Sequence, residues 1–322
     1  MAETKRSMIT SQFPRLVYYH REDDIDSNLH LYSYDVERRN SSVIKNTPAD
    51  MANHKGVCAA YGWMVMLDER TNANSCFLFN PMSMKKITLP PWRAMQWSCC
   101  TLTLPPSHPN SVVAFFDLDR PFIMFCYPGE AIWREQDFID DIAIVQPFNQ
   151  VVCHERQIYC LDFQGVTLIE LTLSNDYRFE IRRQLTMKRP NWHYDDATCY
   201  QRLLVESLGD IFMIYIIFIG FPRKKVREVC VFKLDMDKAE WRRVNDLGDH
   251  RVFFLRESSV MSCSTCIGSS GSSSVRENSI YFILPKEDGI RTTNMCVYNI
   301  REKTFKTYVV CPKSVTYCQW II

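Results

Sequence analysis

The 322-residue sequence predicts an all-β fold, a six-bladed β-propeller whose blades each contain four antiparallel strands. Three observations predict it. One strand–turn–strand phrase recurs six times, no single repeat can bury its own apolar residues, and each end of the chain supplies a strand that needs a partner. The repeats start at Leu31, Phe77, Ile123, Leu168, Val231 and Val297. Three intervals of about 45 residues and two of about 65 are typical of propeller blades with insertions in the last two.

The segment from Val229 to Leu255 shows the phrase most clearly. Apolar and polar residues alternate up to Leu234, a polar turn follows, and the pattern resumes at Trp241 before a second turn. Period-two alternation favours strands with one face buried, and Asp and Gly supply the turn chemistry. We therefore expect two strands of one blade and the first strand of the next.

The first unit begins with a strand over Phe13–His20 and has room for only three strands before the second unit begins near Gly56. The C-terminal segment Val315–Ile322 reads as a strand with no partner beside it in sequence. Pairing of the N- and C-terminal strands would complete this blade and close the ring. Closure removes two sheet edges that otherwise favour aggregation.

The next three units each fit four short strands. The strands of the second unit are expected at Gly56–Ala60, Gly62–Asp68, Phe77–Asn80 and Lys86–Leu89. The strands of the third are expected at Cys99–Leu104, Ser111–Leu118, Phe122–Tyr127 and around Trp133. The strands of the fourth are expected at Ile142–Pro147, Gln157–Phe163, Val166–Leu173 and Tyr177–Arg182. The short turn at Gln164–Gly165 is typical of a tight antiparallel hairpin.

The last two repeats are longer because they contain insertions. A polar, aromatic loop lies between Lys188 and Gln201, a basic connector spans Phe221–Glu228, and a Ser/Gly-rich loop spans Cys266–Asn278. Ser/Gly-rich segments are typical of flexible excursions between strands. Loops of this kind are where propellers place function, and also where sequence drift is tolerated.

Composition indicates a globular protein with an ordinary core. Hydrophobic residues make up 46% of the chain, charged residues 23%, and 38 basic residues against 37 acidic ones give a net charge of +1. This balance provides no global attraction to nucleic acid or to an anionic membrane. We expect one propeller domain over residues 13–322, preceded by a disordered tail over residues 1–12, and a monomer.

The fourteen cysteines are scattered singly along the predicted strands. In a chain of this length they are best interpreted as small buried apolar residues of a reducing compartment. The N-terminus lacks the apolar run of a secretory signal, and the apolar run Ile211–Phe221 is too short to span a bilayer. We therefore expect a cytoplasmic or nuclear protein that does not bind membranes.

Six phrases of the chain resemble a known family. They are Tyr61–Glu69, Phe79–Pro90, Gln157–Leu171, Arg202–Asp210, Val231–Leu255 and Asn278–Pro285. Together, and in this order, they are similar to the plant F-box-associated, kelch-like propeller family with the KIB-type domain. The resemblance extends over nearly the whole chain and implies a kelch-like six-bladed propeller.

The resemblance also implies a role in protein turnover. In that family the propeller usually follows an F-box, which docks on the adaptor of a cullin-based ubiquitin ligase, while the propeller selects the substrate. Only 12 residues precede Phe13, and they have no F-box pattern. We therefore do not expect direct adaptor binding. Two explanations stay open, a propeller-only member of the family or a shortened gene model.

Candidate chemistry is sparse. Cys263 and Cys266 have metal-ligand spacing but no second pair follows, whereas a structural zinc site needs four ligands. His193 beside Asp195 and Asp196, and His154 beside Glu155, are acid/base candidates only if a pocket perturbs them. The ten glycines form no phosphate-binding loop and no nucleophile elbow. We expect no catalytic residue, no metal and no cofactor.

Two other groups of residues are candidates for packing or for binding. Trp133 and Trp241 each follow their repeat start by the same spacing, and we interpret them as structural aromatics that fill the gap between blades. The basic residues Arg223, Lys224, Lys225 and Arg227 and the loop residues Trp192 and His193 are candidates for partner binding. A solvated loop and a nuclear import signal are the alternatives for the basic cluster.

The function that these observations favour is a non-catalytic protein-interaction module. Its partners would be ubiquitin-ligase clients or signalling proteins. The alternative is a kelch-like propeller enzyme, or a binder of a small molecule or metal, that uses the central channel. A degenerate family member that keeps the fold with little function is a third interpretation.

Overall fold

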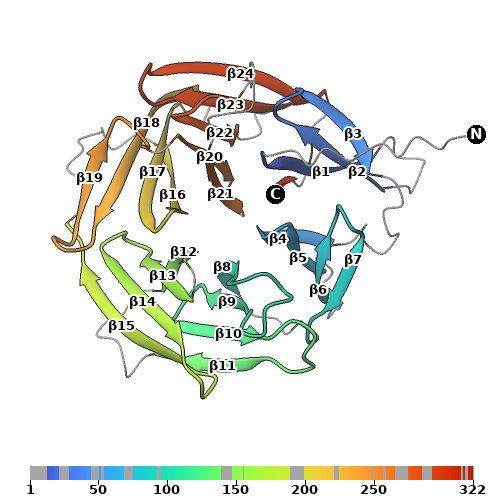
Figure 1. Cartoon of the computed structure of the whole chain (residues 1–322), viewed down its shortest axis with the longest axis vertical. Coiled ribbons are helices and arrows are strands. Elements are labelled where there is room, and N and C mark those ends of the chain that lie inside the picture. Colours follow the sequence, from blue (N-terminus) through green and yellow to red (C-terminus); the bar gives the residue numbers. More distant parts are fainter. Residues whose placement is uncertain are drawn as a thin grey trace, which may run out of the picture.

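The computed structural model describes residues 13–21, 29–44, 51, 54–68, 75–92, 96–138, 147–154, 156–188, 199–220, 225–248, 250–256, 259–264, 275–284, 292–312, 315 and 318–321. Over these residues the chain is all-β and forms six sheets in a ring, which confirms the predicted six-bladed propeller (Figure 1). The tail expected over residues 1–12 lies outside the described residues.

Blades 1 to 3 are four-stranded antiparallel sheets whose strands are ordered from the axis outward. Blade 1 contains β25 Cys318–Ile321, β1 Arg15–Arg21, β2 Leu29–Asp35 and β3 Asn40–Ile44. Blade 2 contains β4 His54–Ala60, β5 Trp63–Asp68, β6 Cys76–Asn80 and β7 Lys85–Thr88. Blade 3 contains β8 Trp97–Leu102, β9 Val113–Asp117, β10 Phe122–Cys126 and β11 Arg134–Asp137.

Blades 4 and 5 repeat this plan and blade 6 extends it. Blade 4 contains β12 Phe148–His154, β13 Gln157–Asp162, β14 Thr167–Leu173 and β15 Phe179–Thr186. Blade 5 contains β16 Cys199–Ser207, β17 Asp210–Ile219, β18 Lys225–Asp235 and β19 Glu240–Val244. Blade 6 contains β21 Ser259–Ser264, β20 Arg251–Arg256, β22 Ser279–Ile283, β23 Thr293–Asn299 and β24 Thr304–Cys311.

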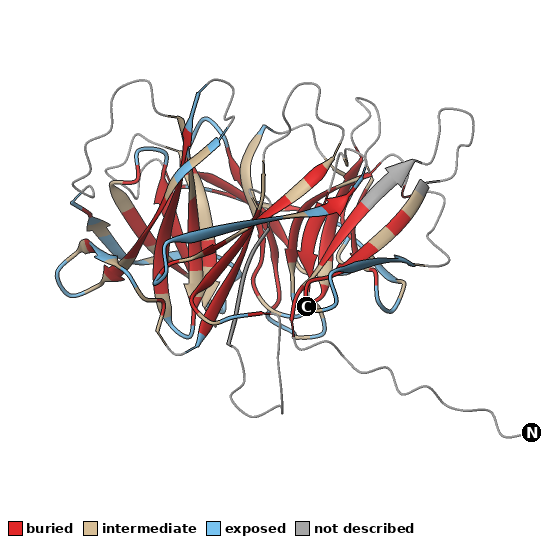
Figure 2. Cartoon of the chain, turned by 90° about the horizontal axis from the view of Figure 1, so that it is seen from above, coloured by how far each residue is buried: buried red, intermediate tan, exposed pale blue. Residues whose placement is uncertain are grey.

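The hydrophobic core lies between the blades. Six clusters of buried side chains fill the six gaps, and each cluster draws its residues from two neighbouring sheets. Seen at right angles to Figure 1, buried residues fill the strands in the interior of the molecule, whereas the turns are mostly exposed or intermediate (Figure 2). Each blade therefore depends on both neighbours to remove its apolar surface from water.

Strand β17 shows how this arrangement differs from the one-sided burial expected from alternation. Phe212, Ile214 and Ile216 face the gap toward blade 6, whereas Met213 and Ile217 face the gap toward blade 4. Both sides of the strand are buried, so its sequence reads as a continuous apolar run. The same holds for the centre of β18, where the expectation of one buried face was wrong.

The ring closes as predicted, by pairing of β1 with β25. The register joins Leu16 to Trp320 and Val17 to Gln319 in an antiparallel ladder. The Trp320 side chain is fully buried, and its indole N–H donates to the carbonyl of Leu255 in blade 6 at 3.2 Å. This strand thus connects the first and last blades.

The turn before the outermost strand has the same construction in four blades. An Asp or Asn ends the preceding strand, and its side-chain oxygen accepts two backbone N–H bonds from the turn, at Asp35, Asn80, Asp235 and Asn299. Four residues after each of them comes a non-glycine residue with positive φ: Arg39, Met84, Ala239 and Lys303. Such Asx turns fix a sharp hairpin.

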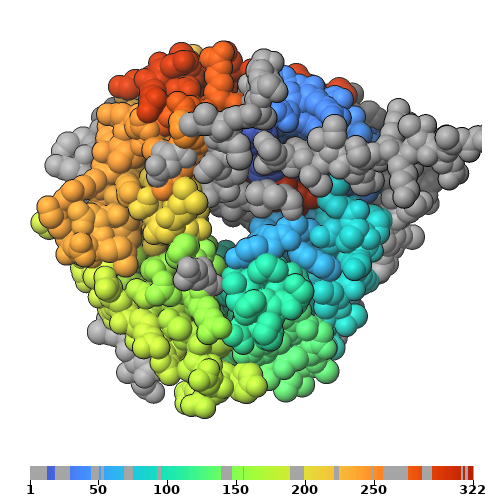
Figure 3. Space-filling view, viewed as in Figure 1, coloured from blue at the N-terminus to red at the C-terminus, as the bar shows by residue number. Residues whose placement is uncertain are grey.

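Blade 6 departs from the regular pattern. Strands β20 and β21 form an antiparallel hairpin, and β20 pairs in parallel with β22, so that β21 takes the innermost position. There β21 contacts the innermost strands of blades 1, 2 and 5. Figure 1 shows β21 close to the centre of the ring, where Figure 3 shows a small opening.

Two predicted strand positions need correction. The first strand of blade 4 is β12, not Ile142–Pro147, because a two-residue hairpin pairs His154 with Gln157 and draws Phe148–His154 into the sheet. Residues 142–146 lie outside the described residues. Trp133 lies immediately before β11 rather than within it. The six repeat starts fall, as expected, in the strand next to the outermost one of each blade.

Candidate functional site

The two faces of the ring carry different connections. Because strands alternate in direction in blades 1 to 5, the turns between second and third strands open on the same face as the links between blades. We call this the loop face. The opposite face, the turn face, carries the turns between first and second strands and between third and fourth strands.

Four of the six predicted partner-binding residues lie outside the described residues: Trp192, His193, Arg223 and Lys224. The strands that flank these segments end together at the loop face, because Cys199 pairs with Phe218 and Ile219 with Lys225. Lys225 and Arg227 belong to β18, not to the connector expected over Phe221–Glu228. A bulge after Ile217 carries the β17–β18 ladder on to Lys225, and both basic side chains are exposed on it.

Three exposed apolar side chains lie at the loop-face ends of blades 4 and 5, near the boundary between the two blades, and one of them, Ile219, pairs with Lys225. Phe163, in the turn between β13 and β14, is 62% exposed, Tyr200 is 49% exposed and Ile219 is 52% exposed. Tyr200 pairs with Ile217, which points to the same side of β17 as Ile219. We call Phe163, Tyr200, Arg202, Ile219 and Lys225 the blade 4–5 surface.

Arg202 holds this surface together. It lies two residues after Tyr200, on the same side of β16, and its guanidinium reaches across to blade 4. It donates to the carbonyls of Phe163 at 2.8 Å and Asp162 at 3.1 Å, and to the side-chain oxygen of Asn149 at 3.3 Å. The three acceptors share the two hydrogens of one nitrogen, Nη2, and these bonds connect the turn that carries Phe163 to blade 5.

Of the acid/base candidates, only His154 is among the residues that the structure describes. His193, Asp195, Asp196 and Glu155 lie outside the described residues. His154 pairs instead with Glu206, with 2.8 Å between Nδ1 and Oε1, on the neighbouring innermost strands β12 and β16. Sequence reasoning missed Glu206 because the two residues are far apart in the chain and meet only when adjacent blades do.

Tyr61 comes close to this pair from blade 2. Its hydroxyl donates to the carbonyl of Thr103 at 3.0 Å. Burial, and then the nearby Cys153 and Glu206, raise the pKa of Tyr61 to about 12. With its proton donated to Thr103, the phenol oxygen can accept a hydrogen bond at the turn-face end of the channel.

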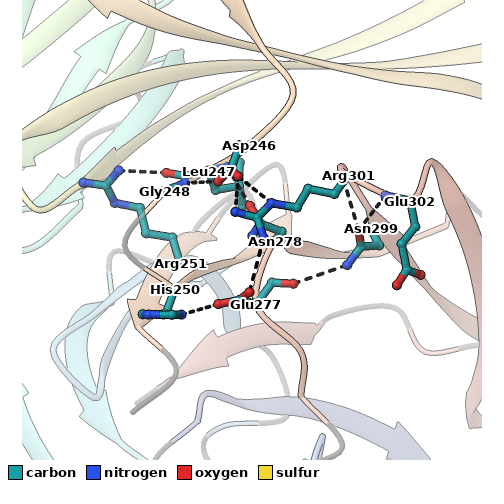
Figure 4. A network of polar contacts seen from close by, with 10 residues as sticks. All are labelled: Asp246, Leu247, Gly248, His250, Arg251, Glu277, Asn278, Asn299, Arg301 and Glu302. Carbon is teal, nitrogen blue, oxygen red and sulfur yellow. Dashed lines mark hydrogen bonds and ion pairs between the residues drawn. The ribbon is translucent and has the colours of Figure 1, made fainter. Parts of the chain in front are cut away.

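A larger polar network joins blades 5 and 6 (Figure 4). Arg301 pairs with Asp246 and lies 3.5 Å from Glu277, which also contacts His250. The side chain of Asn278 accepts from the backbone N–H of Leu247 at 2.7 Å. Because these residues bind one another across the boundary between two blades, we assign the network to the structure of the ring.

The cysteines whose side chains the structure describes are thiols and form no disulfide among themselves. Burial raises the pKa of Cys76 to about 12 and also that of Cys296 to about 12, which makes them poor nucleophiles and poor metal ligands at neutral pH. Within the part of the chain that the structure describes, no group of three or more His, Cys, Asp or Glu side chains is arranged to hold a metal ion. Of the predicted Cys263–Cys266 pair, Cys263 belongs to β21 and Cys266 lies outside the described residues.

The two predicted structural tryptophans lie between blades. Trp133 is buried between blades 2 and 3, where its indole N–H donates to the carbonyl of Pro91 at 3.0 Å. Trp241 is buried between blades 4 and 5 beside Leu234. Each large ring thus covers area from two sheets.

Sequence reasoning missed most of the blade 4–5 surface. The available signal was Phe163, a large aromatic residue in an otherwise polar turn, Asp162–Gly165. Ile219 gave no signal because it continues an apolar strand whose preceding residues are buried, and Tyr200 gave none because it stands near the start of a strand that mixes apolar and polar residues. Their exposure follows from their position at the ends of the strands.

Comparison with known proteins gives relatives of one kind. F-box protein At2g26160 of Arabidopsis thaliana is 30% identical over 192 residues, which is 55% of this chain and 53% of the relative. At3g25750, which also carries an F-box protein name, is 27% identical over 147 residues, 43% of this chain and 36% of its own length. The chain thus spans about half or less of the length of these curated relatives.

Solved structures are more distant. The periplasmic gluconolactonase of Pseudomonas aeruginosa aligns over 96% of this chain and 99% of its own, with 10% identity and a TM-score of 0.40. A protein from Lactobacillus plantarum aligns over 96% and 100%, with 6% identity and a TM-score of 0.45. At these scores neither likeness carries an argument about function.

The described residues include no helix long and apolar enough to cross a membrane.

The KIB1-4 beta-propeller family model matches residues 32–299, which contain strands of all six blades. The family resemblance seen in the six sequence phrases is thereby confirmed, and this chain belongs to the KIB1-4 beta-propeller family.

Proposed function

We propose that this chain is a non-catalytic protein-interaction module that selects protein partners, as the substrate-recognition part of an F-box ubiquitin ligase does. The observation that supports this most is the family match over the propeller itself, together with relatives that carry F-box names. Propellers present loops from many blades on one rigid face, which suits them to binding other proteins.

The partner-binding residues belong to the proposal. They are Arg223, Lys224, Lys225, Arg227, Trp192 and His193, in or beside the two segments that connect strands at the loop face of blade 5. Aromatic and Arg side chains are enriched at protein interfaces, because they bury much area and form several hydrogen bonds. We propose clients of the ubiquitin pathway or signalling proteins as partners, a monomeric state, and a location in the cytoplasm or nucleus.

The test is quantitative affinity purification of the tagged full chain from cross-linked plant cells. The test variant reverses the charge of Arg223, Lys224, Lys225 and Arg227 to Glu. A matched control reverses Lys85, Lys238, Lys303 and Lys306, four exposed lysines elsewhere on the ring. Partners that the wild type and the control enrich, and that the test variant loses, are the expected result. Absence of any protein enriched over untagged cells would refute the proposal.

A second candidate function is binding of a small molecule at the channel. The pair of His154 and Glu206, with the Tyr61 hydroxyl nearby, favours it, because three groups able to form hydrogen bonds converge near the axis. A thermal-shift screen with metabolites and divalent metals tests it. Ligand stabilisation that His154→Ala removes would support this function, and no shift with any compound would exclude most of it.

A further inference from the structure

We propose that the blade 4–5 surface docks a partner segment in which one or two large apolar side chains are flanked by carboxylates. The inference rests on the proposed function and names the chemistry of the partner. It is carried by the blade 4–5 surface, formed by Phe163, Tyr200, Arg202, Ile219 and Lys225, with Arg227 next to it on β18.

The apolar part of this surface is more than a set of scattered residues. Phe163, Tyr200 and Ile219 are each about half exposed or more, although they come from three elements of two blades. Tyr200 lies edge-on to the buried Tyr215, with ring centroids 5.5 Å apart, so one side of its ring packs against the protein. Aromatic side chains held in place lose little conformational entropy on binding, which is why they dominate interface hot spots.

The rigidity of the surface comes from Arg202. Its bonds to the carbonyls of Asp162 and Phe163 hold the β13–β14 turn against β16, so Phe163 and Tyr200 keep a fixed spacing. Gly165 makes this contact possible, since a Cβ there would lie 2.0 Å from the Arg202 guanidinium. A surface fixed in advance loses less entropy when a partner docks.

Charge decides the kind of partner. Lys225, which pairs with Ile219, is exposed on β18, and Arg227 is exposed two residues further along the same strand. The neighbouring described carboxylates are already engaged, because Asp162 is buried and accepts from the N–H of Val166 at 2.7 Å, and Glu228 pairs with Arg243. A positive edge beside an apolar patch complements a segment that carries Asp or Glu next to Leu, Ile or Phe.

The experiment is selection of a random-peptide phage library on the immobilised full chain, followed by affinity measurement of the enriched peptides. We expect enriched peptides that combine carboxylates with large apolar residues. Their affinity should fall about tenfold or more with Phe163→Ala and Tyr200→Ala together, as expected for removal of a hot spot. It should fall several-fold with Lys225→Glu and decrease as salt rises.

The matched control replaces exposed apolar residues on the opposite face, Met82→Ala with Ile132→Ala, which are 53% and 64% exposed. This control should bind the selected peptides as the wild type does. All four apolar side chains substituted in the two double variants are largely exposed, so neither variant should lose much stability. Melting temperatures equal to that of the wild type will show that both variants are folded. Arg202 positions the surface without belonging to its apolar part, so Arg202→Gln should weaken peptide binding less than the Phe163→Ala and Tyr200→Ala double variant does. Arg202→Lys, which keeps the positive charge, should restore part of the affinity.

Several results would overturn the inference. These are no enriched peptide, enriched peptides without carboxylates, or equal binding to the Phe163→Ala and Tyr200→Ala variant. Binding to anionic lipid vesicles that the same substitutions abolish, without peptide binding, would also overturn it. If the partners recovered from plant cells bind the Phe163→Ala and Tyr200→Ala double variant as strongly as they bind the wild type, the inference fails while the proposed function stands. If peptide selection succeeds while no cellular partner is found, the proposed function fails and the surface still binds the peptide chemistry inferred for it.

Discussion

Single residues set the geometry of the candidate surface, and Gly165 is the sharpest case. Its φ of +72° is one that residues with a Cβ adopt at a cost, and the Arg202 guanidinium occupies the space a Cβ would need. Gly165→Ala should therefore lower the free energy of unfolding by about 2–3 kcal/mol, from backbone strain and weakened Arg202 hydrogen bonds. Urea denaturation measures this loss.

Gly129 is the matched control for that prediction. Its φ is +89°, but no atom lies within 4 Å of the position of a Cβ. Gly129→Ala carries the backbone strain alone and should cost about 1–2 kcal/mol. Equal losses at both positions would show that Arg202 moves aside freely, and the argument for a fixed surface would then fail.

Buried thiols make stability depend on alkaline pH. The pKa of Cys76 and that of Cys296 are each about 12 in the folded chain, against an ordinary value of 9.0, because burial disfavours the thiolate. A raised folded-state pKa contributes stability that is fully present below pH 9 and is lost as pH rises toward 12. Each thiol should therefore lower the free energy of unfolding by up to about 1.4 kcal/mol per pH unit above pH 9.

The measurement is urea denaturation in reducing buffer at intervals from pH 8 to pH 10.5. Replacing Cys76 and Cys296 with Ala lowers stability at every pH, because small cavities form. The informative quantity is the slope, which should become shallower in the double variant. An unchanged slope would mean that these thiols ionise as readily in the folded chain as in the unfolded one.

At the scale of elements, the turn before the outermost strand explains why the strand–turn–strand repeat could be recognised in the sequence. Asp235 accepts backbone N–H bonds from Asp237 and Lys238, and the turn ends at Ala239 with a φ of +49°. A left-handed backbone costs alanine more than glycine. Ala239→Gly should therefore raise the free energy of unfolding by about 0.5–1 kcal/mol.

The comparison for that turn is Ala60→Gly at the end of β4, where φ is not positive. Added chain entropy should lower stability there by about 0.5–1 kcal/mol. Opposite signs at the two positions, measured by thermal melting, are the expected outcome. A loss at Ala239 would show that its methyl group, which packs against the core between blades 4 and 5, outweighs the backbone strain.

The elements that sequence could predict are those with local signals. The strands that carry the repeat starts were found because each ends in a turn with Asp, Asn or Gly. The first strand of blade 4 was misplaced because β12, Phe148–His154, mixes polar and apolar residues and most of its side chains are only partly buried. The parallel pairing of β20 with β22 could not be foreseen, since it depends on which strand lies nearer the axis and not on any local residue.

The candidate surface was predicted only in part, for a similar reason. Basic residues near Lys225 formed a visible cluster in the sequence. Phe163 and Tyr200 lie far apart in the chain, and their elements are joined through Arg202, which stands two residues after Tyr200 and donates to the carbonyl of Phe163. The pair of His154 and Glu206 is another contact between neighbouring blades. Sequence repeats predict the blades well, but a site built across two blades requires knowledge of how they stack.

At the scale of the whole molecule, stability comes from six interfaces between blades. The interface between blades 6 and 1 depends on one short strand, β25. β25 pairs with β1 in blade 1, Gln319 donates to the carbonyl of Gly56 in blade 2 at 2.7 Å, and Trp320 donates to Leu255 in blade 6. Trp320 also packs against Phe254, with ring centroids 5.0 Å apart. This strand of four residues, β25, thus connects three blades.

Trp320→Ala should therefore destabilise the entire ring. Removing a fully buried indole leaves a cavity and an unsatisfied carbonyl, and the expected loss is about 3–5 kcal/mol in the free energy of unfolding. Trp320→Phe keeps most of the packing and loses the hydrogen bond, so about 1–2 kcal/mol is expected. Because each blade is buried by both neighbours, loss of closure should expose blades 1 and 6 first. Hydrogen exchange should then accelerate in β1 and β20 before β9 or β13. Uniform acceleration in all blades, or a Trp320→Ala melting temperature equal to that of the wild type, would show that the ring is held by its inner contacts without the terminal strand.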